Sequence, residues 1–191
     1  MNSKITSSFK YAAVILMGLM ALTRFNHFGT QFSLPDATLA VFFLGSFLVG
    51  GRYLFIALLI EAGLIDYIAI TQFSVSDFCI SPAYVFLIPT YGVMWVAGHY
   101  ASAFKSLKSI EFFKSVGLLL IATSLAFVIS NGSFYVLSDK INTLSILDYV
   151  KRVEQYYYPY VGSTLTYGVF GLAIIRLLKL FPTVLLNHKS V

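Results

Sequence analysis

Charged residues and cysteine are both scarce in this sequence. Only 11% of the 191 residues are charged, whereas 58% are hydrophobic and 17% aromatic, and the mean hydropathy is +0.82. Because soluble domains carry about 25% charged residues, this composition excludes an ordinary soluble domain and predicts an integral membrane protein. The net charge of +5 does not indicate nucleic-acid binding, since the basic residues lie in short connections between apolar runs. There they act as topology signals and contacts for anionic headgroups.

Several chemistries are disfavoured by what is missing. The single cysteine, Cys79, cannot form a disulfide within the chain. The absence of CxxC, HExxH or a histidine cluster argues against a metal site built by the protein alone. No GxxxxGK[ST] loop supports ATP hydrolysis by this chain, so any energy from ATP would have to come from a partner.

Six apolar runs predict an all-α integral membrane protein in which residues 1–191 form one six-helix transmembrane domain. The approximate spans are 9–25, 37–50, 53–72, 82–104, 113–131 and 160–182, and most approach the ~20 residues that cross a bilayer core of about 30 Å.

Two features of this assignment are the separation of the second run from the third and the retention of the first helix. The run 37–50 is short, but merging it with the next run would give a helix of about 54 Å at ~1.5 Å per residue. We therefore expect a tight turn at Gly50-Gly51-Arg52. No small-x-small cleavage site follows Leu22, so the first helix is expected to be retained.

The basic residues predict the orientation. With the N-terminus inside, nine fall inside (Lys4, Lys10, Arg52, Lys105, Lys108, Lys114, Arg176, Lys179 and Lys189) and four outside (Arg24, Lys140, Lys151 and Arg152). This bias favours cytoplasmic termini. The loops 25–36, 73–81 and 132–159 then face the exterior or periplasm.

The segment from Ser74 to Tyr84 contains Cys79 and is more polar than the runs on either side. A thiolate is a soft metal ligand and a nucleophile, so this segment is a candidate site. The alternative is that Cys79 is a small apolar residue buried at a helix end.

Glu61 and Asp66 are the acidic residues within the predicted spans. A charge at the bilayer centre costs at least ~2.5–3.5 kcal/mol and usually has a function. Five residues rotate a helix by about 500°, which leaves the two side chains about 140° apart, so they cannot form one carboxylate pair. Glu61 is expected to be structural, whereas Asp66 lies at the depth of an outer pocket.

The predicted loop 132–159 ends in a tyrosine cluster, 156–160. Tyrosines at that depth typically form an interfacial belt. Alternatively, the loop is a lid whose tyrosine rings cover a flat ligand while Arg152 reaches a polar edge.

The predicted topology brings different side chains to one membrane face. Arg24, Asn26 and His27 follow the first span, and Asp66 nears the end of the third. The residues expected to bind a ligand are His27, Asp66, Tyr84, Arg152, Tyr156 and Tyr158, in addition to Cys79.

A resemblance to a known family rests on the length, the helix count, the expected cytoplasmic termini and four parts of the sequence: Arg24-Phe-Asn-His27, Asp66, Asp77-Phe-Cys-Ile-Ser-Pro-Ala-Tyr84 and Tyr91-Gly-Val-Met-Trp95. Over nearly its whole length the chain resembles the substrate-binding S components of energy-coupling-factor (ECF) vitamin transporters, specifically the BtuM-type cobalamin transporters of the Gram-negative inner membrane. The resemblance implies that Cys79 is the axial ligand to the cobalt of cobalamin. A corrin supplies four equatorial nitrogens, so a single protein thiolate is enough.

The resemblance also implies partners, namely an ECF transmembrane coupling subunit and ATPases encoded elsewhere. S components usually dock through small residues four apart on the first helix. Here Ser8 and Ala12 are the nearest match, so transport by this chain alone is the alternative.

The sequence is also compatible with two other function classes. One is a membrane thiol enzyme that uses Cys79 with His27 and Asp66, and the other is a structural membrane protein without a small ligand. A hybrid of transporter and enzyme is a further alternative. In it, thiolate donation from Cys79 to cobalt releases the upper axial group of cobalamin, such as cyanide, so that Cys79 is catalytic as well.

Overall fold

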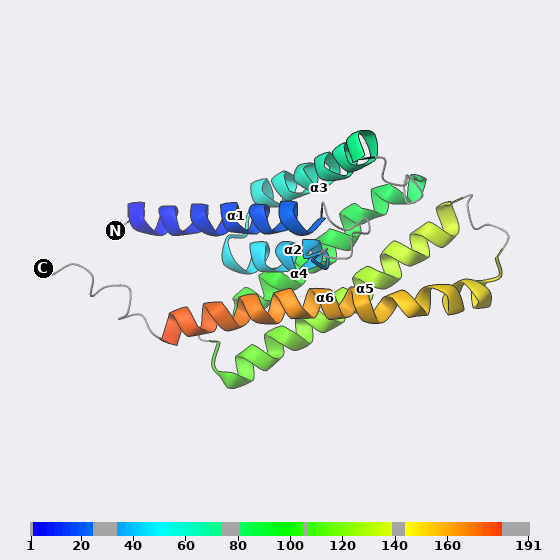
Figure 1. The fold of residues 1–191 in the computed structure, drawn as a ribbon. Helices are drawn as coiled ribbons and strands as arrows, with labels where there is room; N and C mark the ends of the chain where they lie inside the picture. Colours follow the sequence, from blue (N-terminus) through cyan, green and yellow to red (C-terminus); the bar gives the residue numbers. More distant parts are fainter. Residues whose placement is uncertain (1, 25–33, 74–80, 105–106, 139–143, 181–191) are drawn as a thin grey trace, which may run out of the picture.

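A computed structural model of the protein describes residues 2–24, 34–73, 81–104, 107–138 and 144–180. These residues form the helices α1 (Asn2–Arg24), α2 (Thr38–Leu48), α3 (Arg52–Phe73), η1 (Pro82–Phe86), α4 (Leu87–Ser102), α5 (Ser109–Leu137) and α6 (Ile146–Leu180). The helices run up and down in a bundle, with the start of α1 and the end of α6 at the same end (Figure 1). The described residues contain no strand, which confirms the all-α prediction.

Three helices are long and apolar enough to cross a membrane, namely α3, α5 and α6. The structure therefore supports a membrane protein with at least these candidate spans. Six transmembrane spans and the orientation of the termini remain predictions.

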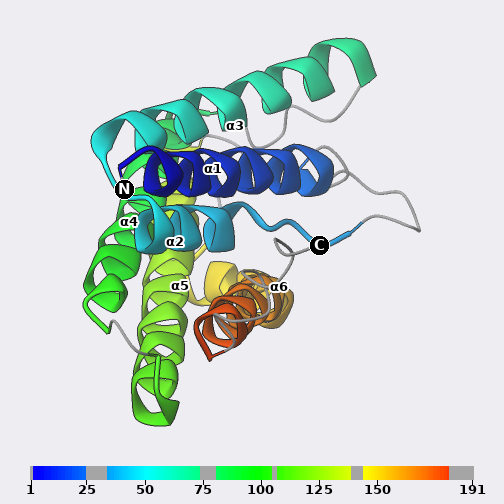
Figure 2. The ribbon, with the colours of Figure 1, turned by 90° about the vertical axis from the view of Figure 1, so that its left-hand side faces the viewer.

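The shortest of the described α-helices, α2, lies in the middle of the bundle (Figure 2). Ten of its 11 residues are buried, and α1, α3, α4 and α6 pack around it. Its 11 residues extend about 16 Å at ~1.5 Å per residue, which is short of a bilayer core. A helix that is hydrophobic on all sides is a buried helix, so the apolar character of α2 is explained by protein neighbours.

The predicted turn between α2 and α3 is confirmed. Gly50 and Gly51 have φ angles of 65° and 80°, in the left-handed region that side chains with a Cβ rarely adopt. Two consecutive glycines therefore end α2 and let the chain reverse into α3.

Close packing of α2 against α4 depends on Gly98. A Cβ at this position would collide with the backbone carbonyl of Phe43 and would lie 3.0 Å from the Cβ of Ser46. Since the first obstacle is backbone, it cannot be moved by a rotamer change. Gly98 therefore sets the separation between α2 and α4.

The prediction of a long loop over 132–159 was wrong. α5 continues to Leu137 and α6 begins at Ile146, so most of that range is helical. Ser145 caps α6, because its Oγ accepts from the backbone N–H of Asp148 at 3.2 Å and donates to the Asp148 carboxylate at 2.6 Å. Such a cap supports a polar first turn, whereas the hydrophobic-run criterion recognises only the apolar part of α6.

The predicted span 82–104 also begins differently. Its first five residues form the 3₁₀ helix η1, in which Pro82 occupies the first turn and the Oγ of Ser81 accepts from the N–H of Ala83 at 3.3 Å. Proline fits the first turn because no N–H partner is needed there.

Candidate ligand site at one end of the bundle

A buried polar cluster lies where α1 ends and α2 begins. It consists of Arg24, Asp36, Thr38, Asp66, Tyr84 and Tyr91, contributed by α1, the residues before α2, α2, α3, η1 and α4. Arg24 and Asp66 are each only 7% exposed. Because buried charges require partners, the contacts within this cluster decide how the end of the bundle is organised.

The centre of the cluster is a two-pronged ion pair between Arg24 and Asp66. Nε of Arg24 donates to Oδ1 at 2.8 Å, and Nη2 donates to Oδ2 at 2.6 Å. This fork-to-fork geometry is among the strongest and most directional in proteins. It ties the C-terminal end of α1 to the C-terminal half of α3.

The remaining donors of Arg24 reach α2 and α4. Nη1 donates to Oγ1 of Thr38 at 3.2 Å and to the hydroxyl of Tyr91 at 3.0 Å, and the Asp36 carboxylate lies 3.8 Å from Nη1. Asp36 also accepts from the backbone N–H of Thr38 at 2.9 Å and from its hydroxyl at 2.6 Å. One guanidinium therefore links four helices.

Tyr84 joins the cluster from the cysteine segment. Its hydroxyl donates to Oδ2 of Asp66 at 2.7 Å. The described chain resumes at Ser81, two residues after Cys79, and Tyr84 follows in η1. The structure thus brings together Asp66 and Tyr84, two of the predicted ligand residues, although their binding role remains a prediction.

Aromatic rings pack against one another next to the polar cluster, beginning at Tyr91. The ring of Tyr91 stacks on Phe42 at 4.4 Å between centroids and 9° between planes, and Phe55 packs edge-on against both Phe42 and Trp95. Tyr91 and Trp95, both from the motif that carried the resemblance, therefore serve the packing of α2, α3 and α4.

Other predicted residues do not belong to the polar cluster. Arg152, Tyr156 and Tyr158 are exposed on α6, and Tyr158 is 81% exposed. Tyr157 and Tyr160 of the same tyrosine run instead pack edge-on against Phe127 of α5. A helix places neighbouring residues on different faces, so the five-residue run does not act as one surface.

His27 and Cys79 lie outside the described residues. Glu61 is described, and its Oε2 is buried without a hydrogen-bond partner among the described residues. It is separate from the polar cluster, in agreement with the expectation that Glu61 and Asp66 do not form one carboxylate pair.

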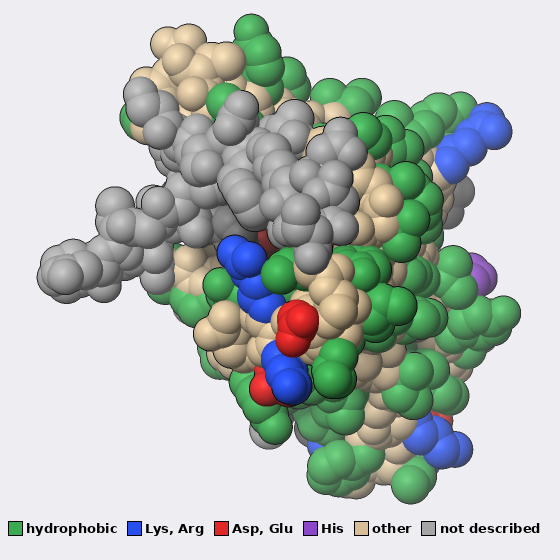
Figure 3. Space-filling model, turned by 90° about the vertical axis from the view of Figure 1, so that its right-hand side faces the viewer, with side chains coloured by type: hydrophobic (Ala, Val, Ile, Leu, Met, Phe, Trp, Pro, Cys, Tyr) green, Lys and Arg blue, Asp and Glu red, His purple; other side chains and the backbone are tan. Residues whose placement is uncertain are grey.

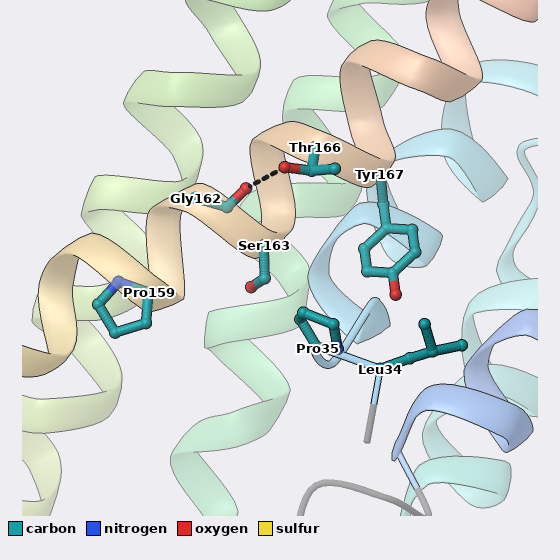
Figure 4. A pocket seen from close by; sticks show the side chains of 7 residues that line it. All are labelled: Leu34, Pro35, Pro159, Gly162, Ser163, Thr166 and Tyr167. Carbon is teal, nitrogen blue, oxygen red and sulfur yellow. Dashed lines mark hydrogen bonds between the residues drawn. The ribbon is translucent and has the colours of Figure 1, made fainter. Parts of the chain in front are cut away.

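A cavity of about 530 Å³ lies beside the cluster, between the residues before α2 and the middle of α6. Its lining is mostly apolar and comprises Leu34, Pro35, Pro159, Gly162, Ser163, Thr166 and Tyr167 (Figure 4). The hydroxyl of Thr166 donates to the Gly162 carbonyl at 2.8 Å, and that of Ser163 to the Tyr160 carbonyl at 3.1 Å. The volume falls within the ~300–1,000 Å³ typical of ligand pockets.

Sequence reasoning placed Arg24 at this face but did not assign it as the central partner of Asp66. The available signal was an arginine at the end of one apolar run and an aspartate inside another, since intramembrane charges tend to pair. Among the described residues, no group of three or more histidine, cysteine or acidic side chains could hold a metal ion.

Comparison of the sequence with models of known protein families and with curated proteins finds no match.

Proposed function

We propose that the protein is a six-span, S-component-like membrane protein that binds cobalamin at the end bearing the polar cluster and mediates its uptake. The contact that supports this best is the 2.7 Å hydrogen bond from Tyr84 to Asp66. This bond attaches Tyr84, the last residue of the segment that contains Cys79, to the buried polar cluster. If the family resemblance holds, the corrin binds next to this cluster. In this proposal Cys79 supplies the axial thiolate to the cobalt of the transported ligand.

The cluster is suited to support a large flat ligand. The Arg24–Asp66 pair neutralises itself, and its hydrogen bonds join several helices, so the platform is rigid. Corrin has apolar faces and an amide-bearing rim, which match aromatic rings and polar side chains respectively. His27 and Arg152 would meet the rim, with Tyr156 and Tyr158 near its outer edge.

The thiol-enzyme alternative requires a base that Asp66 could orient. Both carboxylate oxygens of Asp66 already accept hydrogen bonds, from Arg24 and from Tyr84. This engagement favours a structural platform over a catalytic triad with His27 and Cys79.

The proposed location is the bacterial inner membrane, with both termini cytoplasmic and the polar cluster toward the periplasm. An ECF coupling subunit and ATPases encoded elsewhere would supply energy. The proposal includes release of cyanide as an accessory step, in which the thiolate binds one axial position, cyanide leaves with its electron pair from the other, and cobalt keeps its oxidation state.

Cobalt content and colour test the proposal. Protein expressed with cobalamin and purified in detergent should carry a visible corrin spectrum and about one cobalt per chain. A colourless, cobalt-free preparation that also fails to bind added cobalamin would refute it and would leave the enzyme or structural alternatives.

A further inference from the structure

The end of the bundle opposite the polar cluster is strongly basic. There α2, α4 and α6 end while α3 and α5 begin (Figure 1). Five described basic residues form what we call the basic collar: Arg52, Lys108, Lys114, Arg176 and Lys179. Glu111 is the only acidic residue that the described chain places at this end. The collar therefore carries a clear excess of positive charge.

Aromatic rings position the cations of the collar. The guanidinium carbon of Arg176 lies 5.5 Å from the ring centroid of Phe112, and Nη2 donates to Oγ of Ser109 at 3.1 Å. Nζ of Lys179 lies 5.8 Å from the ring centroid of Phe47. Such contacts hold the aliphatic stem along an apolar surface while the charge remains at its edge.

Two further collar residues, Lys114 and Arg52, follow the same pattern. Nζ of Lys114 lies 6.0 Å from the centroid of Phe104, and the guanidinium carbon of Arg52 lies 5.0 Å from that of Tyr53. These four cations come from three helices, α3, α5 and α6, so the positive charge at this end of the bundle is not confined to one helix.

Exposed apolar side chains lie next to these cations in the chain. Ile110 lies in the first turn of α5 and Phe113 directly follows that turn, whereas Leu177 and Leu178 lie between Arg176 and Lys179. A surface that alternates exposed hydrocarbon with positive charge matches the boundary between acyl chains and headgroups. A soluble polyanion such as nucleic acid would gain nothing from the hydrocarbon.

The opposite end of α6 has a different charge pattern. Exposed Lys151 and Arg152 lie there between exposed Asp148 and Glu154, and Figure 3 shows positive and negative side chains side by side on this face. Because the charges at that end compensate one another, attraction for anions is concentrated at the collar.

We propose that the basic collar binds the headgroups of anionic phospholipids in the leaflet that surrounds this end of the bundle. This inference is independent of the transported ligand. Each basic side chain near an anionic surface contributes enough to strengthen association about fivefold, which corresponds to ~1 kcal/mol.

The test uses full-length protein in phosphatidylcholine vesicles containing spin-labelled phosphatidylglycerol or, separately, spin-labelled phosphatidylcholine. Electron paramagnetic resonance gives the fraction of each label immobilised by the protein. We expect a preference for phosphatidylglycerol that falls several-fold in Lys179→Gln and further in Arg176→Gln/Lys179→Gln. Arg176→Lys, which keeps the charge, should retain the preference.

Lys151→Gln is the matched control, since it makes the same change at an exposed position on the other end of α6. The proposal is overturned if wild type shows no preference, or if Lys151→Gln lowers the preference as much as Lys179→Gln. Binding of a fluorescent oligonucleotide without any lipid preference would assign the collar to a soluble polyanion instead. Circular dichroism and thermal unfolding identify variants that lose the fold, and the comparison of the two Lys→Gln variants still decides the question.

Discussion

The guanidinium of Arg24 donates two hydrogen bonds, of 2.8 and 2.6 Å, to the carboxylate of Asp66, which lies 42 residues further along the sequence. Both side chains are almost completely buried. This ion pair joins the end of α1 rigidly to the C-terminal half of α3, and the other residues of the polar cluster contact this pair.

Removing one member of this pair is expected to destabilise the protein strongly. Asp66→Asn or Arg24→Gln leaves an uncompensated buried charge, with an expected loss of ~3–5 kcal/mol in the free energy of unfolding. The double variant Arg24→Gln/Asp66→Asn should recover part of that loss. Denaturant unfolding in detergent measures it, and a single variant as stable as Lys151→Gln would contradict the assignment.

The Tyr84 hydroxyl can be tested without removing the ring. Tyr84→Phe deletes the donor to Asp66 and should cost ~1.5–3 kcal/mol of stability, the usual contribution of a hydrogen bond to a charged group. Tyr100→Phe is the control, because Tyr100 is exposed on α4, and it should have little effect. Equal stabilities for the two variants would show that the Tyr84 hydrogen bond does not support the cluster.

Substitution of Cys79 separates cobalt ligation from packing. Cys79→Ser preserves size, but a neutral hydroxyl is a poor donor to cobalt. We expect loss of the thiolate-dependent spectrum and at least about tenfold weaker cobalamin binding, or ~1.4 kcal/mol, while expression and thermal stability stay normal. Unchanged affinity and spectrum would refute the axial-ligand assignment.

Gly98 and Gly92 provide a matched pair on α4. Gly98→Ala drives a Cβ into the backbone of Phe43 and should destabilise by ~1–3 kcal/mol, as overpacking does. Gly92 has no atom within 4 Å of an added Cβ, so Gly92→Ala should be neutral or stabilising by ~0.5–1 kcal/mol. Thermal unfolding compares the two, and similar midpoints would mean that α2 and α4 do not approach as closely as described.

The sequence by itself determined the properties that depend on local patterns. Long apolar runs indicated helices and a membrane environment, and Gly50-Gly51 located a turn whose positive φ angles suit glycine. Rotation along a helix was enough to separate Glu61 from Asp66. The up-and-down order of the helices then brought Asp66 and Tyr84 to the same end.

Only the tertiary structure decided which distant groups meet. No local pattern specifies that Arg24 pairs with Asp66 while also reaching Tyr91, or that the apolar residues of α2 face protein neighbours. The start of α6 was missed for a different reason: its polar first turns begin at the local Ser145–Asp148 cap, which a search for apolar runs does not detect. The packing of Tyr157 and Tyr160 against Phe127 of α5 is again a tertiary contact. Hydropathy records how apolar each residue is, whereas burial and pairing depend on which helices the folded chain places side by side.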